Sequence, residues 1–204
     1  MYLNFFMKLL LFVDMHGSLN SLEEIKKKSG DADLIVCAGD ITIFESDIEF
    51  FIAELAKLGK EVIIIHGNHE DQKTLESLCL LYDNIHFVHK KKKKIGDVLF
   101  IGYGGGGFSF KDKELENVGG KMSKWIKEHK KGKIIVVSHG PPYGTKLDKL
   151  NEDHVGNITL RKFIMQNKVD FLICGHLHEN EYKKDMLKKT ILINPGPNGM
   201  IIEV

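Results

Sequence analysis

Short apolar runs recur along the chain, and most of them end in a glycine, an acidic residue or a histidine. Each run is rich in isoleucine, leucine or valine at successive positions, which is typical of strands that are buried on both faces. We therefore expect buried strands at five places, namely residues 8–14, 33–40, 61–69, 133–140 and 170–176.

Between these runs the apolar residues recur three or four positions apart, which is the period of an amphipathic helix. This period predicts helices at residues 18–28, 45–58, 70–81 and 155–166. Strand alternating with helix indicates parallel strands joined by crossovers and covered by helices on both faces. Residues 85–101 predict two more strands around a polar turn, and residues 182–204 offer two further short strands as antiparallel additions.

Length and charge narrow the class of protein. A chain of 204 residues is suited to one domain, which we place at residues 1–204. Its 29 basic residues nearly balance its 28 acidic ones, so no overall field favours nucleic acid or an anionic membrane. Its three cysteines lie far apart, which argues against disulfides and for a reducing compartment. We therefore expect a cytoplasmic protein with no membrane partner.

The apolar start of the chain is read as a strand, because the run from Leu9 to Val13 is too short to span a membrane and no cleavage site follows it. We take residues 8–13 as the first strand and residues 1–6 as an N-terminal extension. The start codon is left open between Met1 and Met7.

Polar side chains follow all five expected strands. Because the carboxyl ends of strands collect reactive groups, we expect these side chains to converge on one edge of one sheet. They comprise two carboxylates, one amide and four imidazoles, on Asp14, His16, Asp40, Asn68, His139, His176 and His178. Seven such donors exceed the needs of one tetrahedral ion and match two divalent ions that share a carboxylate. Such a pair activates a bridging water or hydroxide for attack on a phosphoester.

The last two of these histidines lie in the stretch CGHLH at residues 174–178. In an extended strand His176 and His178 would point to the same side, about 6 to 7 Å apart. That separation is too large for one ion but suits two neighbouring ions.

The five strand ends resemble the motifs of the calcineurin-like metallophosphoesterases, which run D-x-H, G-D, G-N-H-[DE], H and G-H-x-H. They appear here as DMH at 14–16, GD at 39–40, GNHE at 67–70, SHG at 138–140 and GHLH at 175–178. NPGP at 194–197 also resembles a stretch that follows the last motif, so the resemblance covers residues 8–197. It implies one α/β domain in which two sheets pack face to face between helices, with a dinuclear site on one edge.

The resemblance also implies a role for each residue. Asp14, His16 and His178 would bind one metal, and the other would be bound by Asn68, His139 and His176, with Asp40 bridging the two. His69 would be catalytic, either protonating the leaving alkoxide or donating to a phosphoryl oxygen. Nitrogen and oxygen donors suit Mn²⁺, Fe, Zn²⁺ and Ni²⁺ alike. We take Mn²⁺ as the first expectation.

The stretch SHGPPYGTKLDKLNEDHVGNITLRKFI resembles a branch of small phosphoesterases related to the bacterial cyclic AMP phosphodiesterase. This favours a phosphodiester as the substrate, and a small-molecule phosphoester in particular. A phosphomonoesterase and a nuclease of the same fold are the first alternatives. A catalytically silent metal-binding scaffold for other proteins is the alternative from a different class. The chain alone leaves homo-oligomerisation open.

Arg161, the only arginine, and His154 follow the SHGPP motif and are candidates for binding substrate phosphate, with a solvated helix residue and a helix cap as the alternatives. The run from Lys90 to Lys94 invites a nucleic-acid interpretation, but no aromatic residue interleaves with it to stack on bases. We read it as a solvated hairpin tip and expect no nucleic-acid partner. Gly104–Gly107 lack the Lys-Ser or Lys-Thr of a phosphate loop and predict a flexible turn.

Overall fold

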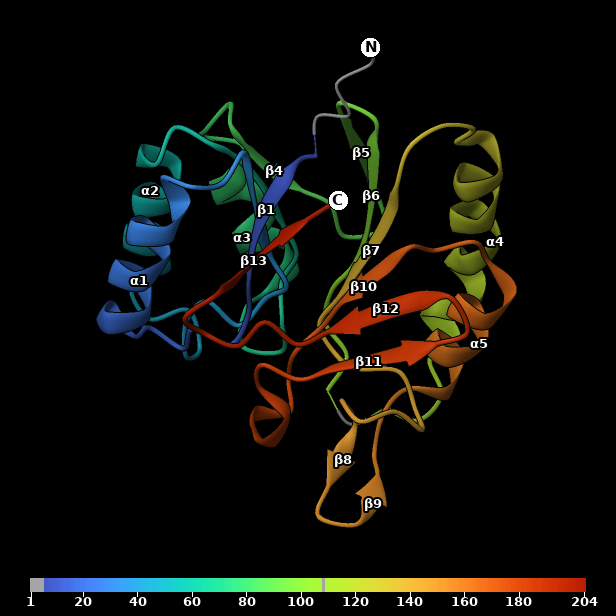
Figure 1. The fold of residues 1–204 in the computed structure, drawn as a ribbon. Coiled ribbons are helices and arrows are strands. Elements are labelled where there is room, and N and C mark those ends of the chain that lie inside the picture. Colours follow the sequence, from blue (N-terminus) through green and yellow to red (C-terminus); the bar gives the residue numbers. More distant parts are fainter. Residues whose placement is uncertain (1–5, 108) are drawn as a thin grey trace.

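The first of two main sheets contains mostly parallel strands from the N-terminal half of the chain. The computed structural model describes residues 6–107 and 109–204, and residues 1–5 of the expected N-terminal extension lie outside them. The strand order is β13-β1-β2-β3-β4, and only β13 is antiparallel to its neighbour (Figure 1). The strands are β1 Lys8–Phe12, β2 Leu34–Cys37, β3 Glu61–Ile64, β4 Ile85–Phe87 and β13 Met200–Glu203.

The second sheet has the order β11-β12-β10-β7-β6-β5, with a parallel centre and an antiparallel strand at each edge. Its strands are β5 Lys92–Ile95, β6 Val98–Tyr103, β7 Ile134–Ser138, β10 Phe171–Ile173, β11 Lys184–Leu187 and β12 Thr190–Ile193. A separate small ribbon pairs β8 Lys149–Leu150 with β9 Asp153–His154.

Helices cover the outer face of each sheet, as Figure 1 shows on its left and right sides. The first sheet carries α1 Leu19–Ser29, α2 Ile48–Lys57 and α3 Gln72–Cys79, and the second carries α4 Lys113–Glu128 and α5 Ile158–Gln166. Side-chain caps explain where four helices begin, because an oxygen of the residue before each helix accepts a backbone N–H of the first turn. These caps are Ser18, Asp71, Asp112 and Asn157.

The two sheets pack face to face over a shared apolar layer. Along β1, Leu9 and Leu11 point into the layer between the sheets, whereas Leu10 and Phe12 pack against the helices. Phe100 of β6 enters the same central layer from the second sheet. The prediction of strands buried on both faces, and of two sheets between helices, is confirmed. None of the helices in residues 6–107 and 109–204 has the length and hydrophobicity of a membrane span.

Several elements differ from the expectation. Helix α4 was not predicted, because the adjacent Gly119 and Gly120 weaken the helical signal of its sequence. Residues 85–101 contribute to three strands instead of two, and β4 belongs to a different sheet from β5 and β6. The prediction of a hairpin tip at Lys90–Lys94 is wrong, because Lys92, Lys93 and Lys94 form most of edge strand β5. Strand β11 was also missed, and β12 is parallel to β10.

Candidate metal centre

The expected ligands lie on turns that follow strands, and four of them have an unusual backbone. Asp14, His16, Asp40 and His176 have φ angles of 56°, 49°, 52° and 71°, in the left-handed region that non-glycine residues rarely adopt. Such conformations cost about 1 to 3 kcal/mol each and persist where the surroundings impose them. Here the backbone N–H of His16 donates to the carbonyl oxygen of Asp40, which ties the first turn to the second.

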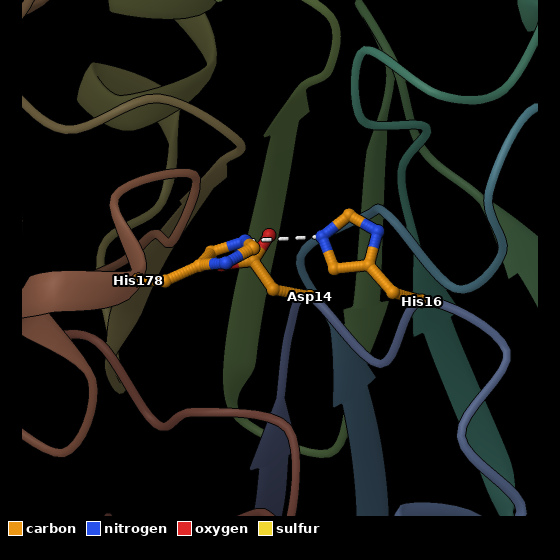
Figure 2. Close-up of side chains that lie close together, drawn as sticks. All are labelled: Asp14, His16 and His178. Atoms are coloured by element: carbon orange, nitrogen blue, oxygen red, sulfur yellow. Dashed lines mark hydrogen bonds between the residues drawn. The ribbon is translucent and has the colours of Figure 1, made fainter.

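One group of possible ligand atoms comes from Asp14, His16 and His178, which Figure 2 shows converging from separate segments. The Nε2 atoms of His16 and His178 lie 3.0 Å apart. Ligand atoms of all three side chains lie within 4.8 Å of one another. The side chains expected to share one ion are therefore brought together.

A second group consists of Asp40, His139 and His176, whose ligand atoms also lie within 4.8 Å of one another. His139 Nε2 is 3.2 Å from Asp40 Oδ2 and 2.9 Å from the side-chain oxygen of Asn68. Asp40 Oδ2 is also 3.8 Å from His16 Nε2, which belongs to the first group. Asp40 thus lies between the two groups, where a bridging carboxylate is expected.

The convergence differs from the expectation in one respect, because it involves both sheets. Asp14, Asp40 and Asn68 follow strands of the first sheet, whereas His139 and His176 follow strands of the second. The prediction of one edge of one sheet is wrong, since face-to-face packing brings the carboxyl ends of both sheets to the same side.

The CGHLH stretch is also not an extended strand. Strand β10 ends at Ile173, His176 adopts a positive φ, and His178 begins a short 3₁₀ helix. The two imidazoles still join different groups, His176 with Asp40 and His178 with Asp14. The separation of their roles is produced by a turn instead of by the alternation of side chains along a strand.

Electrostatics couples the central residues. Burial opposes ionisation of Asp40, but the hydrogen bond and charge of His139 lower the pKa of Asp40 to about 2. Burial likewise opposes the charge on His139, yet Asp40 and Asp14 raise the pKa of that imidazole to about 9. Burial raises the pKa of Asp14 to about 6, against the opposing effect of His139. The negative groups therefore favour a positive charge at the centre, which a proton or a metal cation can supply.

The donor set fits divalent metal ions. His139 Nδ1 lies 3.0 Å from the carbonyl oxygen of Ala38, so an N–H there leaves the Nε2 lone pair facing Asp40 and Asn68. Asp14 Oδ1 is buried without a hydrogen-bond partner among the described residues. Burial raises the pKa of the nearby Cys174 thiol, which favours its protonated form over the thiolate that binds metals. The centre therefore offers nitrogen and oxygen donors, with an acceptor that a cation would satisfy.

Glu70 organises the centre without being an expected ligand. Its buried carboxylate accepts backbone N–H groups of Asp40, Thr42 and Gly67, at 3.0, 3.1 and 2.8 Å. These bonds fasten the turn that carries Asp40 to the turn that carries Asn68. Sequence reasoning gave Glu70 no role, although the acidic fourth position of GNHE was a signal for one.

Two glycines make the close packing of these turns possible. A Cβ on Gly67 would lie 1.9 Å from Asp40 Oδ1, and one on Gly175 would lie 2.5 Å from Asp14 Oδ2. Any side chain at either position would collide with a carboxylate of the centre. The glycines of the GNHE and GHLH motifs are thus explained by sterics.

His69 lies at the accessible side of the centre. Its Nε2 is 4.0 Å from Asp40 Oδ2, its backbone N–H donates to Asp40 Oδ1, and its side chain is 22% exposed. The ring of Phe44 lies 4.7 Å from the His69 ring, centroid to centroid, and Phe44 is 79% exposed. Sequence reasoning missed Phe44, since a lone aromatic residue in a loop carries no pattern.

Arg161 and His154 lie in the segment that follows His139 and contact that segment itself. The Arg161 guanidinium donates to the carbonyl oxygens of Tyr143 and Gly144, at 2.7 and 3.2 Å. His154 Nδ1 is 2.7 Å from the fully buried carboxylate of Asp148. Neither is in the groups of possible metal ligands, and their role in binding substrate stays a prediction.

The model of the calcineurin-like phosphoesterase family matches residues 7–180 of this chain. The chain belongs to this family. As a calcineurin-like phosphoesterase it is a metal-dependent hydrolase of phosphoesters, and the family uses two metal ions. This agrees with two adjoining groups of ligand atoms in the structure.

Individual relatives support the same fold. An uncharacterized protein of Methanocaldococcus jannaschii is 32% identical over 211 residues, which cover 97% of this chain and 91% of that protein. A dimetal phosphatase from Danio rerio superimposes with a TM-score of 0.67 at 11% identity, over 94% of this chain and 89% of its own. An archaeal phosphodiesterase gives a TM-score of 0.51 at 18% identity, over 93% and 84% of the two chains.

Proposed function

We propose that this calcineurin-like phosphoesterase hydrolyses a small phosphodiester, with two divalent metal ions bound by the seven residues described above. The observation that carries the proposal is the position of Asp40, whose carboxylate lies within reach of both groups of ligand atoms. Asp14, His16 and His178 would hold one ion, and Asn68, His139 and His176 the other. Mn²⁺ is the first candidate, and Fe, Zn²⁺ and Ni²⁺ suit the same donors.

When bound, the two ions would supply a water nucleophile at neutral pH and neutralise charge on the phosphoryl oxygens. The protein's part is to hold the carboxylates and imidazoles in place and to manage the proton on the leaving group. His69 is placed for the latter task, because its Nε2 lies beside Asp40 and its side chain is partly exposed. It would donate a proton to the leaving alkoxide or a hydrogen bond to a phosphoryl oxygen.

Two features favour a diester over a monoester. The PPYGTKLD and HVGN stretches resemble the cyclic nucleotide phosphodiesterase branch, and the exposed ring of Phe44 offers a surface for the second ester substituent. The main alternative is a phosphomonoesterase, the activity named for the Danio rerio relative of the same fold.

Activity on two chromogenic substrates separates these proposals. With Mn²⁺, we expect the protein to cleave bis-p-nitrophenyl phosphate faster than p-nitrophenyl phosphate. The reverse order would replace the diesterase by a phosphatase. Failure on both substrates with Mn²⁺, Fe²⁺, Zn²⁺ and Ni²⁺ would favour a metal-binding scaffold instead.

His69→Ala tests the proposed proton donor. The variant should retain both metals, because His69 is not an expected ligand, and should lose about 10²- to 10⁴-fold in kcat. Metal analysis and kinetics on the diester check the two halves of this expectation. Unchanged turnover would remove His69 from the chemistry.

A further inference from the structure

A groove lies between the edge strand β5 and the C-terminal part of helix α4, with a volume of about 510 Å³. Figure 1 shows α4 to the right of β5 and β6, with the loop from α4 into β7 along the top right of the view. We call this the lysine groove, after the residues that dominate its lining, which include Lys92, Lys93, Lys94, Trp125, Lys130 and Lys131.

The lysine groove is strongly basic. Five of its lining residues are lysines, and Glu128 is its one acidic lining residue. Outside the lining, Asp97 pairs with Lys131 at 3.2 Å, and within it Glu128 lies 3.7 Å from Lys92. The net charge is positive even with both acidic residues counted. Lysines on an edge strand prevent pairing with other strands, but that explanation does not extend to Lys130 and Lys131, which follow α4.

Trp125 places an aromatic ring among these charges. The ammonium groups of Lys92 and Lys121 lie 5.5 and 5.0 Å from its ring centroid. Both lysine side chains are flexible and solvent-exposed, so they can yield the ring to a ligand. The sequence argument against nucleic acid was that no aromatic residue interleaves with the lysine run, and the fold supplies one from a distant segment.

The groove is separate from the metal centre. The metal ligands follow the carboxyl ends of strands, whereas Leu99 of the groove lies near the start of β6. Lys130 and Lys131 precede β7, whose far end leads to His139. The groove therefore lies at the opposite end of the second sheet from the catalytic residues.

We propose that the lysine groove binds single-stranded nucleic acid, with backbone phosphates on the lysines and a base stacked on Trp125. Cationic side chains beside an exposed aromatic ring are the combination that single strands require, since phosphates and bases alternate along them. An inorganic polyanion would need the lysines alone. This binding function is additional to the phosphoesterase activity and does not depend on it.

Trp125 is the only tryptophan, so its fluorescence reports directly on the groove. The full chain, with Mn²⁺ and separately with EDTA, is titrated with an oligothymidylate of about eight nucleotides. We expect saturable quenching under both conditions. The affinity should fall with salt, with a log–log slope of about −2 to −3 for three or four lysine contacts. Absence of saturable quenching would overturn the proposal.

Charge-reversal variants test the location. The double variant Lys94→Glu with Lys130→Glu should lose at least about tenfold in affinity, because two phosphate contacts become repulsive. Lys27→Glu, on the outer helix α1 with a 77% exposed side chain, is the matched control and should bind like the parent. Equal losses in both variants would mean a nonspecific effect of charge and would overturn the assignment to the groove.

A stacking test separates nucleic acid from other polyanions. Trp125→Ala, followed by anisotropy of a labelled oligothymidylate, should lose about tenfold in affinity, whereas binding of inorganic polyphosphate should not change. Trp125→Phe should restore part of the loss, which also controls for damage to α4. If polyphosphate displaces the oligonucleotide at equal charge concentration and Trp125→Ala binds normally, the groove is a general anion site and the proposal fails.

Discussion

Replacing Glu70 with glutamine tests how the centre is held together. One Glu70 oxygen accepts the N–H groups of Asp40 and Gly67, and the other accepts that of Thr42. Glutamine can keep its carbonyl toward the first pair, but its NH₂ group must then face the Thr42 N–H. One hydrogen bond to a charged acceptor is lost, and two buried donors face each other.

The expected cost follows from these contacts. A hydrogen bond to a charged group contributes about 1.5 to 3 kcal/mol, and a buried unsatisfied donor adds about 1 to 3 kcal/mol. Because burial raises the pKa of Glu70, the folded protein gains somewhat from neutralising this group, which offsets part of the loss. We therefore expect Glu70→Gln to lower the free energy of unfolding by about 3 kcal/mol. For a domain of this size that is a drop in Tm of about 6 to 12 °C.

Urea unfolding in EDTA measures this loss without any contribution from metal binding. Glu23→Gln is a matched control, because Glu23 is a 69% exposed residue on α1, and its unfolding should be unchanged within error. Glu70→Gln should also bind metal more weakly, since the turns that carry Asp40 and Asn68 are no longer fastened together. A change of less than about 0.5 kcal/mol would refute the role given to Glu70, because that is the range of an ordinary surface substitution.

Two further predictions concern packing and pH. Gly67→Ala should destabilise the protein by several kcal/mol and weaken metal binding, since its Cβ would lie 1.9 Å from Asp40 Oδ1. Gly120→Ala, in open space on α4, should instead stabilise it by up to about 1 kcal/mol, and loss of stability there in urea unfolding would contradict the steric argument. Burial lowers the pKa of His89 to about 3, and the Gly104 N–H donates to its Nδ1, so the folded chain favours the neutral imidazole. Its contribution to stability is therefore full above the ordinary pKa of about 6.5 and is lost as the pH falls toward 3, by about 2 kcal/mol at pH 5. His89→Gln should lose less stability between pH 8 and pH 5, and an equal loss in both proteins would contradict this reasoning.

The fold was largely predictable because its strands carry a strong local signal. Successive branched residues, as in the run from Val62 to Ile65, indicate burial on both faces without any knowledge of their neighbours. Helix α4 was missed because two adjacent glycines mask its period, although Leu115, Met122 and Ile126 are buried on one face.

The arrangement of the strands was harder to predict than their existence. Nothing in the local sequence tells that β4 joins β3 whereas β5, a few residues later, joins the other sheet. For that reason the polar strand ends were expected on one sheet, when they come from two.

The candidate site shows the same division. Asp14, His16 and Asp40 were found because each follows an apolar run within a short motif. Contacts between distant segments left no such trace, such as the exposed ring of Phe44 over His69 or the lysines over Trp125. These contacts depend on packing, which the order of residues does not reveal.

The metal content of Asp40→Asn tests the dinuclear centre most directly. An asparagine side chain keeps the size of the carboxylate but loses the charge that lies between the two groups of ligand atoms. The parent protein, loaded with Mn²⁺ and desalted, should retain about two ions per chain. We predict that Asp40→Asn retains fewer than one, because both sites lose a shared ligand. Retention of two ions by the variant would contradict a bridging role for Asp40.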